Sequence, residues 1–140
     1  MGAWGSGSFD NDTAADWVYG LVDAASEDEA LKVLESALSA AAEIPEGEYL
    51  DADVGSCAVA AAAVVAAAAG STADDLPENV AEWVTDHAAA VPASLRVLGK
   101  KALNRVAGSD SELAELWAEG GDDDGFASEI RVLAERLTAD

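Results

Sequence analysis

The stretch from Cys57 to Ala69 reads CAVAAAAVVAAAA and contains no polar side chain, and Gly55 and Gly70 bracket it. A helix that is apolar on every face has to be buried on every face. Its 13 residues fall short of the about 20 that a membrane-spanning helix needs. We therefore predict that residues 51–69 form the central helix of an α-helical protein, whose alanines let neighbouring helices approach closely.

The other long segments repeat apolar residues at helical spacing, and no sustained strand-like alternation interrupts them. A capping box of Ser26 and Glu29 and the helix breakers Pro45, Pro92 and Gly108 mark helix ends. We expect an all-α fold, a compact bundle of about seven helices around the central one. An extended, glycine-rich N-terminal segment precedes it, and the 140 residues fit a single domain, residues 1–140.

The charge is the most unusual feature of the composition. Seven Lys and Arg against 28 Asp and Glu give a net charge of −21. A binder of nucleic acid or of an anionic membrane needs a basic patch, so we expect neither partner. Cys57 is the only cysteine and the N-terminus lacks the pattern of a signal peptide, which together favour a cytoplasmic protein.

Few residues suggest chemistry. His87, the only histidine, lies on an apolar stripe that also holds Val80 and Trp83, which favours a place at the edge of the core over a catalytic role. The acidic stretch Gly121–Gly125 lacks the ligand spacing of an EF-hand. Helix capping accounts for this stretch and for the acids near residue 12 without a metal ion. We predict no catalytic residue, no metal site and no cofactor.

The N-terminus resembles the opening of a bacterial family known as domain of unknown function 4259. That opening has Trp-Gly-x-Gly-x-Phe, then Asn-Asp, then Ala-x-Asp-Trp. The matching residues here are Trp4, Gly5, Gly7, Phe9, Asn11, Asp12, Ala14 or Ala15, Asp16 and Trp17. Similar stretches lie at residues 48–51, at residues 111–117 and in the last helix. The resemblance implies no activity.

Two interpretations of this N-terminal signature remain open. In the first, Trp4 and Phe9 insert between the helices and the segment has a packing role. In the second, polar groups beside an aromatic ring form a small binding site. Its candidate residues are Trp4, Asn11, Asp12, Asp16 and Trp17.

The expected function is that of a binding protein with an acidic surface, and not of an enzyme. A net charge of −21 attracts a basic protein over a distance. The specific function that we expect is that of an immunity or antitoxin-like protein, which binds a basic partner. One alternative is a structural domain adapted to high salt, in which the charge serves solubility. Another is an enzyme that uses carboxylates and a divalent metal. The oligomeric state is left open.

Overall fold

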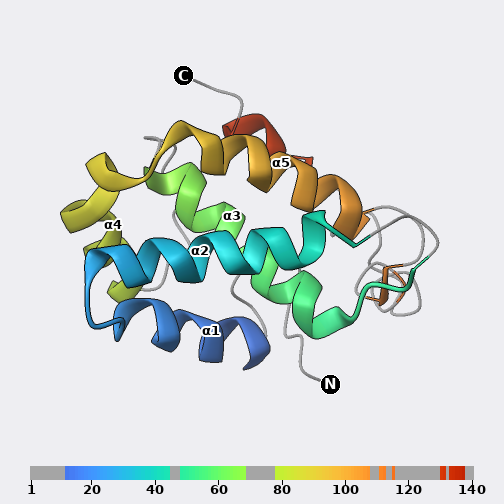
Figure 1. Cartoon of the computed structure of the whole chain (residues 1–140), viewed down its shortest axis with the longest axis horizontal. Coiled ribbons are helices and arrows are strands. Elements are labelled where there is room, and N and C mark those ends of the chain that lie inside the picture. The colour runs from blue at the N-terminus through green and yellow to red at the C-terminus, as the bar shows by residue number, and fades with distance from the viewer. Residues whose placement is uncertain are drawn as a thin grey trace.

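The computed structural model describes residues 12–44, 48–68, 78–107, 111–112, 115, 130–131 and 133–137. The helices with defined bounds are α1 (Asp12–Val22), α2 (Glu27–Ala42), α3 (Ala52–Ala68), α4 (Glu78–His87), the 3-10 helix η1 (Ala88–Ala90) and α5 (Ala93–Ala107) (Figure 1). In these described ranges the only extended pairing is one isolated parallel bridge between Leu50 and Ser111. The all-α prediction is therefore confirmed.

The number of helices differs slightly from the predicted seven. The structure bounds five α-helices and one 3-10 helix, and residues 130–131 and 133–137 are helical as well. One of the seven, expected from a capping box of Ser109 and Glu112, falls mostly outside the described residues, although residues 112 and 115 are helical. The apolar stripe that holds Val80, Trp83 and His87 continues to Val91 and predicts a helix of this length, but α4 ends at His87 and η1 follows it. Pro92 is the cause, because its ring disfavours a helical conformation at Val91, whose backbone is extended.

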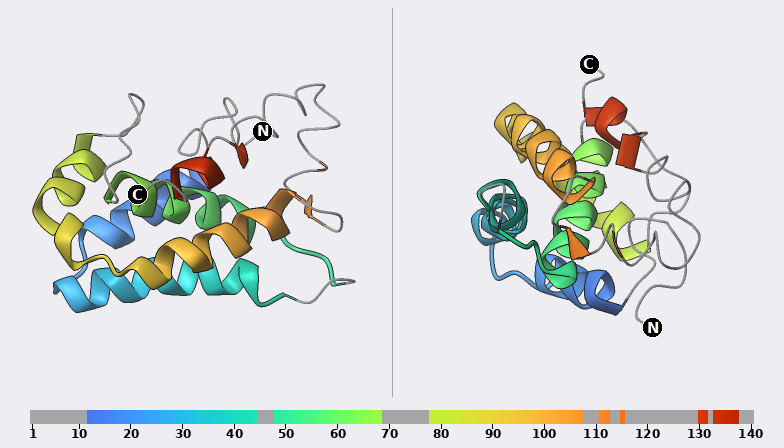
Figure 2. Two further views of the ribbon diagram at one scale, coloured as in Figure 1. Left: turned by 90° about the horizontal axis from the view of Figure 1, so that it is seen from above. Right: turned by 90° about the vertical axis from the view of Figure 1, so that its right-hand side faces the viewer.

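Helix α3 lies in the middle of the bundle and contacts α1, α2, α4, η1 and α5 (Figures 1 and 2). Every residue from Ala58 to Ala67 is buried, as the absence of polar groups predicts. Large side chains from the surrounding helices pack against these alanines and valines. They include Leu21, Leu34, Leu38, Val80, Leu103, Val106, Leu133 and Leu137. The prediction that residues 51–69 form a central buried helix is confirmed.

The ends of α2 and α3 follow local capping rules. Ser26 Oγ accepts a hydrogen bond from the Glu29 amide at 3.2 Å, and Glu29 Oε2 accepts one from the Ala25 amide at 3.3 Å. Asp51 Oδ1 accepts from the Asp53 amide at 2.8 Å, at the start of α3. These bonds satisfy amide groups that have no partner inside the helix.

Arg105 connects α5 to the segment that follows α2. Its Nε donates to the Ile44 carbonyl at 3.1 Å, and its Nη2 donates to the Glu48 carbonyl. The Glu112 amide donates at 2.9 Å to the carbonyl of Leu50, which follows Glu48 in the same segment. The Arg105 bonds hold the connection between α2 and α3 against the end of α5, and the Glu112 bond ties this connection to the segment after α5.

Candidate functional site

The structure describes only part of the N-terminal site predicted from the sequence. Trp4 and Asn11 lie outside the described residues, and Asp12 begins α1 without a described side chain. The side chain of Asp16 is exposed, whereas that of Trp17 is half-buried and lines a groove whose lining does not include Asp16. The two therefore do not share that surface, and whether the five residues form one site stays a prediction.

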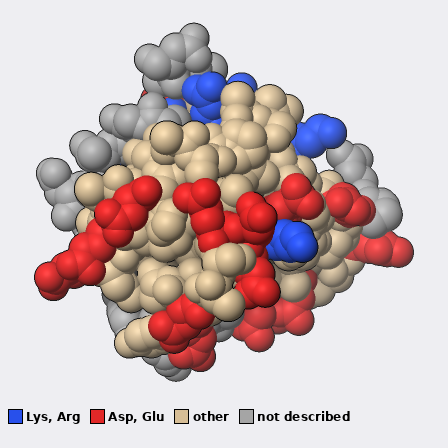
Figure 3. All heavy atoms as spheres, turned by 60° about the vertical axis from the view of Figure 1, so that its left-hand side comes forward, with Lys and Arg blue, Asp and Glu red and all other residues tan. Residues whose placement is uncertain are grey.

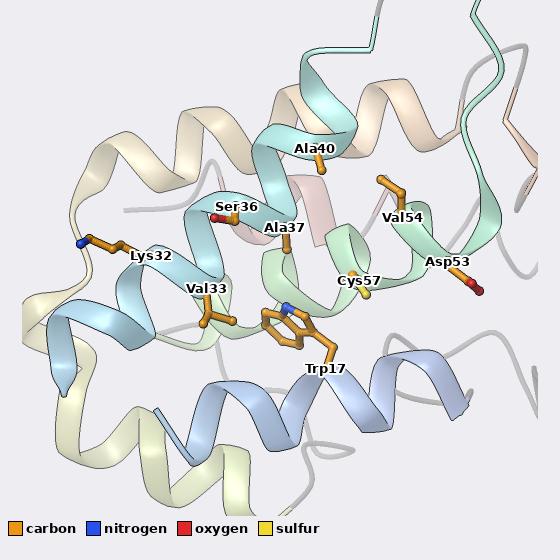
Figure 4. Close-up of a pocket in the computed structure, with 9 residues that line it drawn as sticks. All are labelled: Trp17, Lys32, Val33, Ser36, Ala37, Ala40, Asp53, Val54 and Cys57. Carbon is orange, nitrogen blue, oxygen red and sulfur yellow. The ribbon is translucent and has the colours of Figure 1, made fainter. Parts of the chain in front are cut away.

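The groove beside Trp17 lies between α1, α2 and α3 and has a volume of about 530 Å³ (Figure 4). Helix α1 contributes the indole of Trp17 and α2 contributes one side of the groove. Helix α3 contributes residues from its first turns. The lining residues are Trp17, Lys32, Val33, Ser36, Ala37, Ala40, Asp53, Val54 and Cys57. A volume of this size falls within the range of ligand and hot-spot pockets, about 300–1,000 Å³.

The groove exists because α2 carries short side chains on a second face. Its first face, which includes Leu34 and Leu38, is buried against the core. Val33, Ser36 and Ala40 follow each other by three and four residues, so they share a different face. Ser36 and Ala40 are exposed and short, and they leave room that Trp17 borders from α1 (Figure 4). The sequence analysis missed this face, although its spacing was the signal that would have indicated it.

Charge is sparse inside the groove. Lys32 and Asp53 lie toward opposite ends of the lining, and the thiol of Cys57, from α3, lies between the indole of Trp17 and Asp53 in Figure 4. Burial raises the pKa of the Cys57 thiol, and the negative charge of Asp53 raises this pKa further. The thiol therefore stays protonated and poorly nucleophilic at neutral pH. The groove offers apolar contact and no activated nucleophile.

His87 lies at the edge of the core, where the sequence predicted it. Its ring centroid is 4.9 Å from that of Trp83, and its Nδ1 is 2.7 Å from Glu27 Oε2. This contact joins the end of α4 to the first turn of α2. Among the described residues, no group of three or more His, Cys, Asp or Glu side chains is placed to hold a metal ion. The acidic stretch Gly121–Gly125 lies outside them.

The charged residues are unevenly distributed over the fold. Helix α5 contains Arg96, Lys100, Lys101 and Arg105 and no acid. By contrast, α4 carries three acids and no Lys or Arg, and α2 carries four acids and one lysine. In Figure 3 the acidic side chains cover the middle and lower part of the face, and the basic ones gather mainly at its upper edge.

We call the surface of the α1–α2 turn, the first turn of α2 and α4 the acidic end. The residues that define it are Asp23, Glu27, Asp28, Glu29, Glu82 and Asp86. All of them are exposed. The contact between His87 and Glu27 holds the two elements of this surface together. The acidic end thus combines exposed acids from two segments that this contact joins, although they are about 60 residues apart in the sequence.

The fold and these surfaces define an acidic all-α protein. The chain matches the family model described as Domain of unknown function (DUF4259) over residues 2–129, so it belongs to this family. The match confirms the resemblance predicted from the sequence. Comparisons with curated proteins and with solved structures find no match. None of the helices in the described ranges is long and apolar enough to cross a lipid bilayer.

Proposed function

We propose that this protein binds a basic partner protein through its acidic end, in the manner of an immunity or antitoxin-like protein. The observation that carries the proposal is the segregation of charge. Acids are concentrated on α2, α4 and the α1–α2 turn, while α5 presents four basic residues and no acid. A surface of one sign attracts a partner of the opposite sign and speeds their association.

Uneven charge favours binding over the alternative of a domain adapted to high salt. If the acids served only solubility, they would be useful on every exposed face, including α5. Glu82 and Asp86 instead lie one helical turn apart on α4, where like charges at this spacing destabilise a helix. A basic partner that covers these acids would remove that repulsion.

The test is affinity capture from the lysate of the source organism, with this protein as the bait. We expect a basic protein to be retained at low salt and released at high salt, because screening weakens attraction between exposed charges. The double variant Glu82→Lys/Asp86→Lys should weaken its capture about tenfold or more.

A matched control carries Glu48→Lys and Glu135→Lys. Both residues are exposed and lie away from the acidic end, and the net charge changes by the same amount. This control should retain the partner. Equal loss in the two variants would show that only net charge matters, and retention of neutral or acidic proteins alone would contradict the proposal.

A further inference from the structure

The groove between α1, α2 and α3 has the features of a binding site for a helix. The stripe on α2 extends beyond the groove lining in both directions, to Glu29 and to Glu43, the residue that caps the end of α2. Residues 29, 33, 36, 40 and 43 are separated by four, three, four and three positions. This is the spacing of the contact seam in a coiled coil, so a partner helix can follow α2 over this length.

The size and lining of the groove suit a large apolar side chain. Its volume of about 530 Å³ is bordered by Trp17, Val33, Val54 and the thiol of Cys57. Apolar anchors that fill such pockets supply much of the binding energy of protein interfaces. A helix that lays its apolar face into a groove is a common way to use such a pocket.

The charges that flank the groove indicate the chemistry of the occupant. Glu29 and Glu43 end the stripe on α2, Asp53 lies at one end of the groove, and all three side chains are exposed. Lys32 is the one basic residue in the lining. Three acids against one base favour an occupant with positive charges on either side of its apolar face.

The same charges disfavour other occupants. A second copy of this chain also carries a net charge of −21 and would be repelled. The segment before α1 contains Asp10 and no Lys or Arg, so its side chains bring no positive charge to the acids. A small apolar molecule would make no use of the three acids at all.

We infer that the groove between α1, α2 and α3 receives an amphipathic helix of the basic partner, whose apolar anchor fills the space beside Trp17. Its Lys or Arg residues face Glu29, Glu43 and Asp53. This inference rests on the proposed function and adds a second contact surface, which shares Glu29 with the acidic end. Attraction by the acidic end brings the partner close, and the groove selects among basic proteins for one with an apolar anchor.

The single cysteine provides the readout. Cys57 lines the groove, and the chain contains no other thiol. The probe is a synthetic helical peptide of Leu and Lys, with Leu on one face. One control peptide replaces every Lys with Glu, and another replaces every Leu with Ser. The full-length protein reacts with a small uncharged maleimide in the presence of each peptide.

We expect the Leu/Lys peptide to bind and to slow the modification of Cys57 about tenfold or more, with neither control peptide doing so. Ala40→Trp should weaken binding of the Leu/Lys peptide by a similar factor, because the exposed Ala40 lines the groove and an indole there would fill it. The matched control Ala107→Trp, at an exposed position on α5, should bind as the wild type does.

Other outcomes would overturn the inference. Binding that neither protects Cys57 nor responds to Ala40→Trp would place the peptide elsewhere, and the proposed function would stand on the capture experiment alone. Equal protection by the Leu/Glu peptide would refute the role of charge. A thiol already protected without peptide, and released by Trp4→Ala or by dilution, would assign the groove to the N-terminal segment or to a second copy. If no peptide binds, the inference is wrong.

Discussion

At the scale of single residues, Cys57 combines an apolar position with an ionisable group. It belongs to the helix that forms the core, yet it is half-buried because it faces the groove. Burial raises the pKa of its thiol, and Asp53, one helical turn away, raises it further. Both causes oppose the thiolate, which is the form that reacts with electrophiles.

The first prediction concerns the pH at which this thiol reacts. The rate of alkylation by iodoacetamide should rise with a midpoint above that of an ordinary cysteine. Asp53→Asn should lower the midpoint only in part, because burial is the larger cause. The measurement is the alkylation rate across pH on the folded protein, with the urea-unfolded chain as the reference. A midpoint equal to that of the unfolded chain would contradict this account.

The raised pKa of Cys57 also makes the free energy of unfolding depend on pH in the alkaline range. The folded protein has the higher thiol pKa, so it favours the neutral form more strongly than the unfolded chain does. The stabilisation is complete below the pKa of the unfolded chain and is lost as the pH rises through the pKa of the folded state. Cys57→Ser should reduce this loss at high pH.

A substitution at Asp16 distinguishes the packing interpretation of the N-terminal signature from the binding-site interpretation. Its side chain is exposed, so Asp16→Asn should leave the melting temperature nearly unchanged, with a stability change within about 0.5 kcal/mol. We expect capture of the partner to be unchanged as well, because Asp16 does not line the groove. Trp4→Ala serves as the comparison and should destabilise under either interpretation. An unchanged melting temperature with abolished binding would instead establish a polar site at Asp16.

At the scale of helices, two glycines inside α1 and α5 occupy opposite environments. A Cβ atom added at Gly20 would meet nothing within 4 Å. A Cβ atom at Gly99 would lie 3.1 Å from Leu137 Cδ1 and 3.9 Å from the Cβ of Ala62. Gly99 thus marks the point where α5 passes close to α3 and to the helical residues 133–137.

We predict opposite changes in the free energy of unfolding for substitutions at these two glycines. Gly20→Ala should stabilise the protein by about 0.5–1 kcal/mol, because alanine favours the helix and restricts the unfolded chain. Gly99→Leu should destabilise it by about 1–3 kcal/mol through overpacking. Urea denaturation of both variants measures the change. A stable Gly99→Leu variant would show that the contact between α5 and Leu137 is looser than described.

A charge in the middle of α3 tests whether this helix is the core. Val64 is fully buried, so Val64→Asp should cost more than about 3 kcal/mol by placing an unpaired charge among apolar groups. Val97→Asp is the control, because Val97 on α5 is 63% exposed. Circular dichroism during urea denaturation compares the two. Equal stability of both variants would refute the central position of α3.

At the scale of the whole molecule, the net charge of −21 favours expansion, because the acids repel one another. The packed helices have to resist this repulsion. Salt screens it, and at 1 M the screening length falls to about 3 Å. Stability should therefore depend on salt even though no charged side chain among the described residues is buried in the core.

We predict that the melting temperature rises between low and molar KCl. The rise should be smaller in the Glu82→Lys/Asp86→Lys variant, which replaces two negative charges on α4 with two positive ones. Thermal denaturation followed by circular dichroism measures both. A melting temperature that stays constant over this range would show that the repulsion is negligible in the folded state.

The features that the sequence predicted correctly are local. The buried run of α3 and the capping box of Ser26 each depend on residues that are close together in the sequence. The groove, the Arg105 bonds and the contact between His87 and Glu27 join residues that are far apart, in the last two cases by about 60 positions. Helical spacing shows which face is apolar, but it does not show which helix covers that face. The spacing of Val33, Ser36 and Ala40 therefore indicates the second face of α2, but the groove that α1 and α3 form beside it cannot be predicted from the sequence.

The alanine content of α3 has a consequence for how the protein tolerates mutation. Seven alanines between Ala58 and Ala67 are buried, and each already has the smallest side chain that keeps good helix propensity. Little can be removed from such a helix, so cavities are a minor risk there, while every larger residue adds volume to a filled space. The leucines of α2 face the opposite hazard, because truncation leaves a void. In saturation mutagenesis, the buried alanines of α3 should therefore tolerate glycine better than any larger residue. The buried leucines of α2 should instead be most sensitive to replacement by smaller residues.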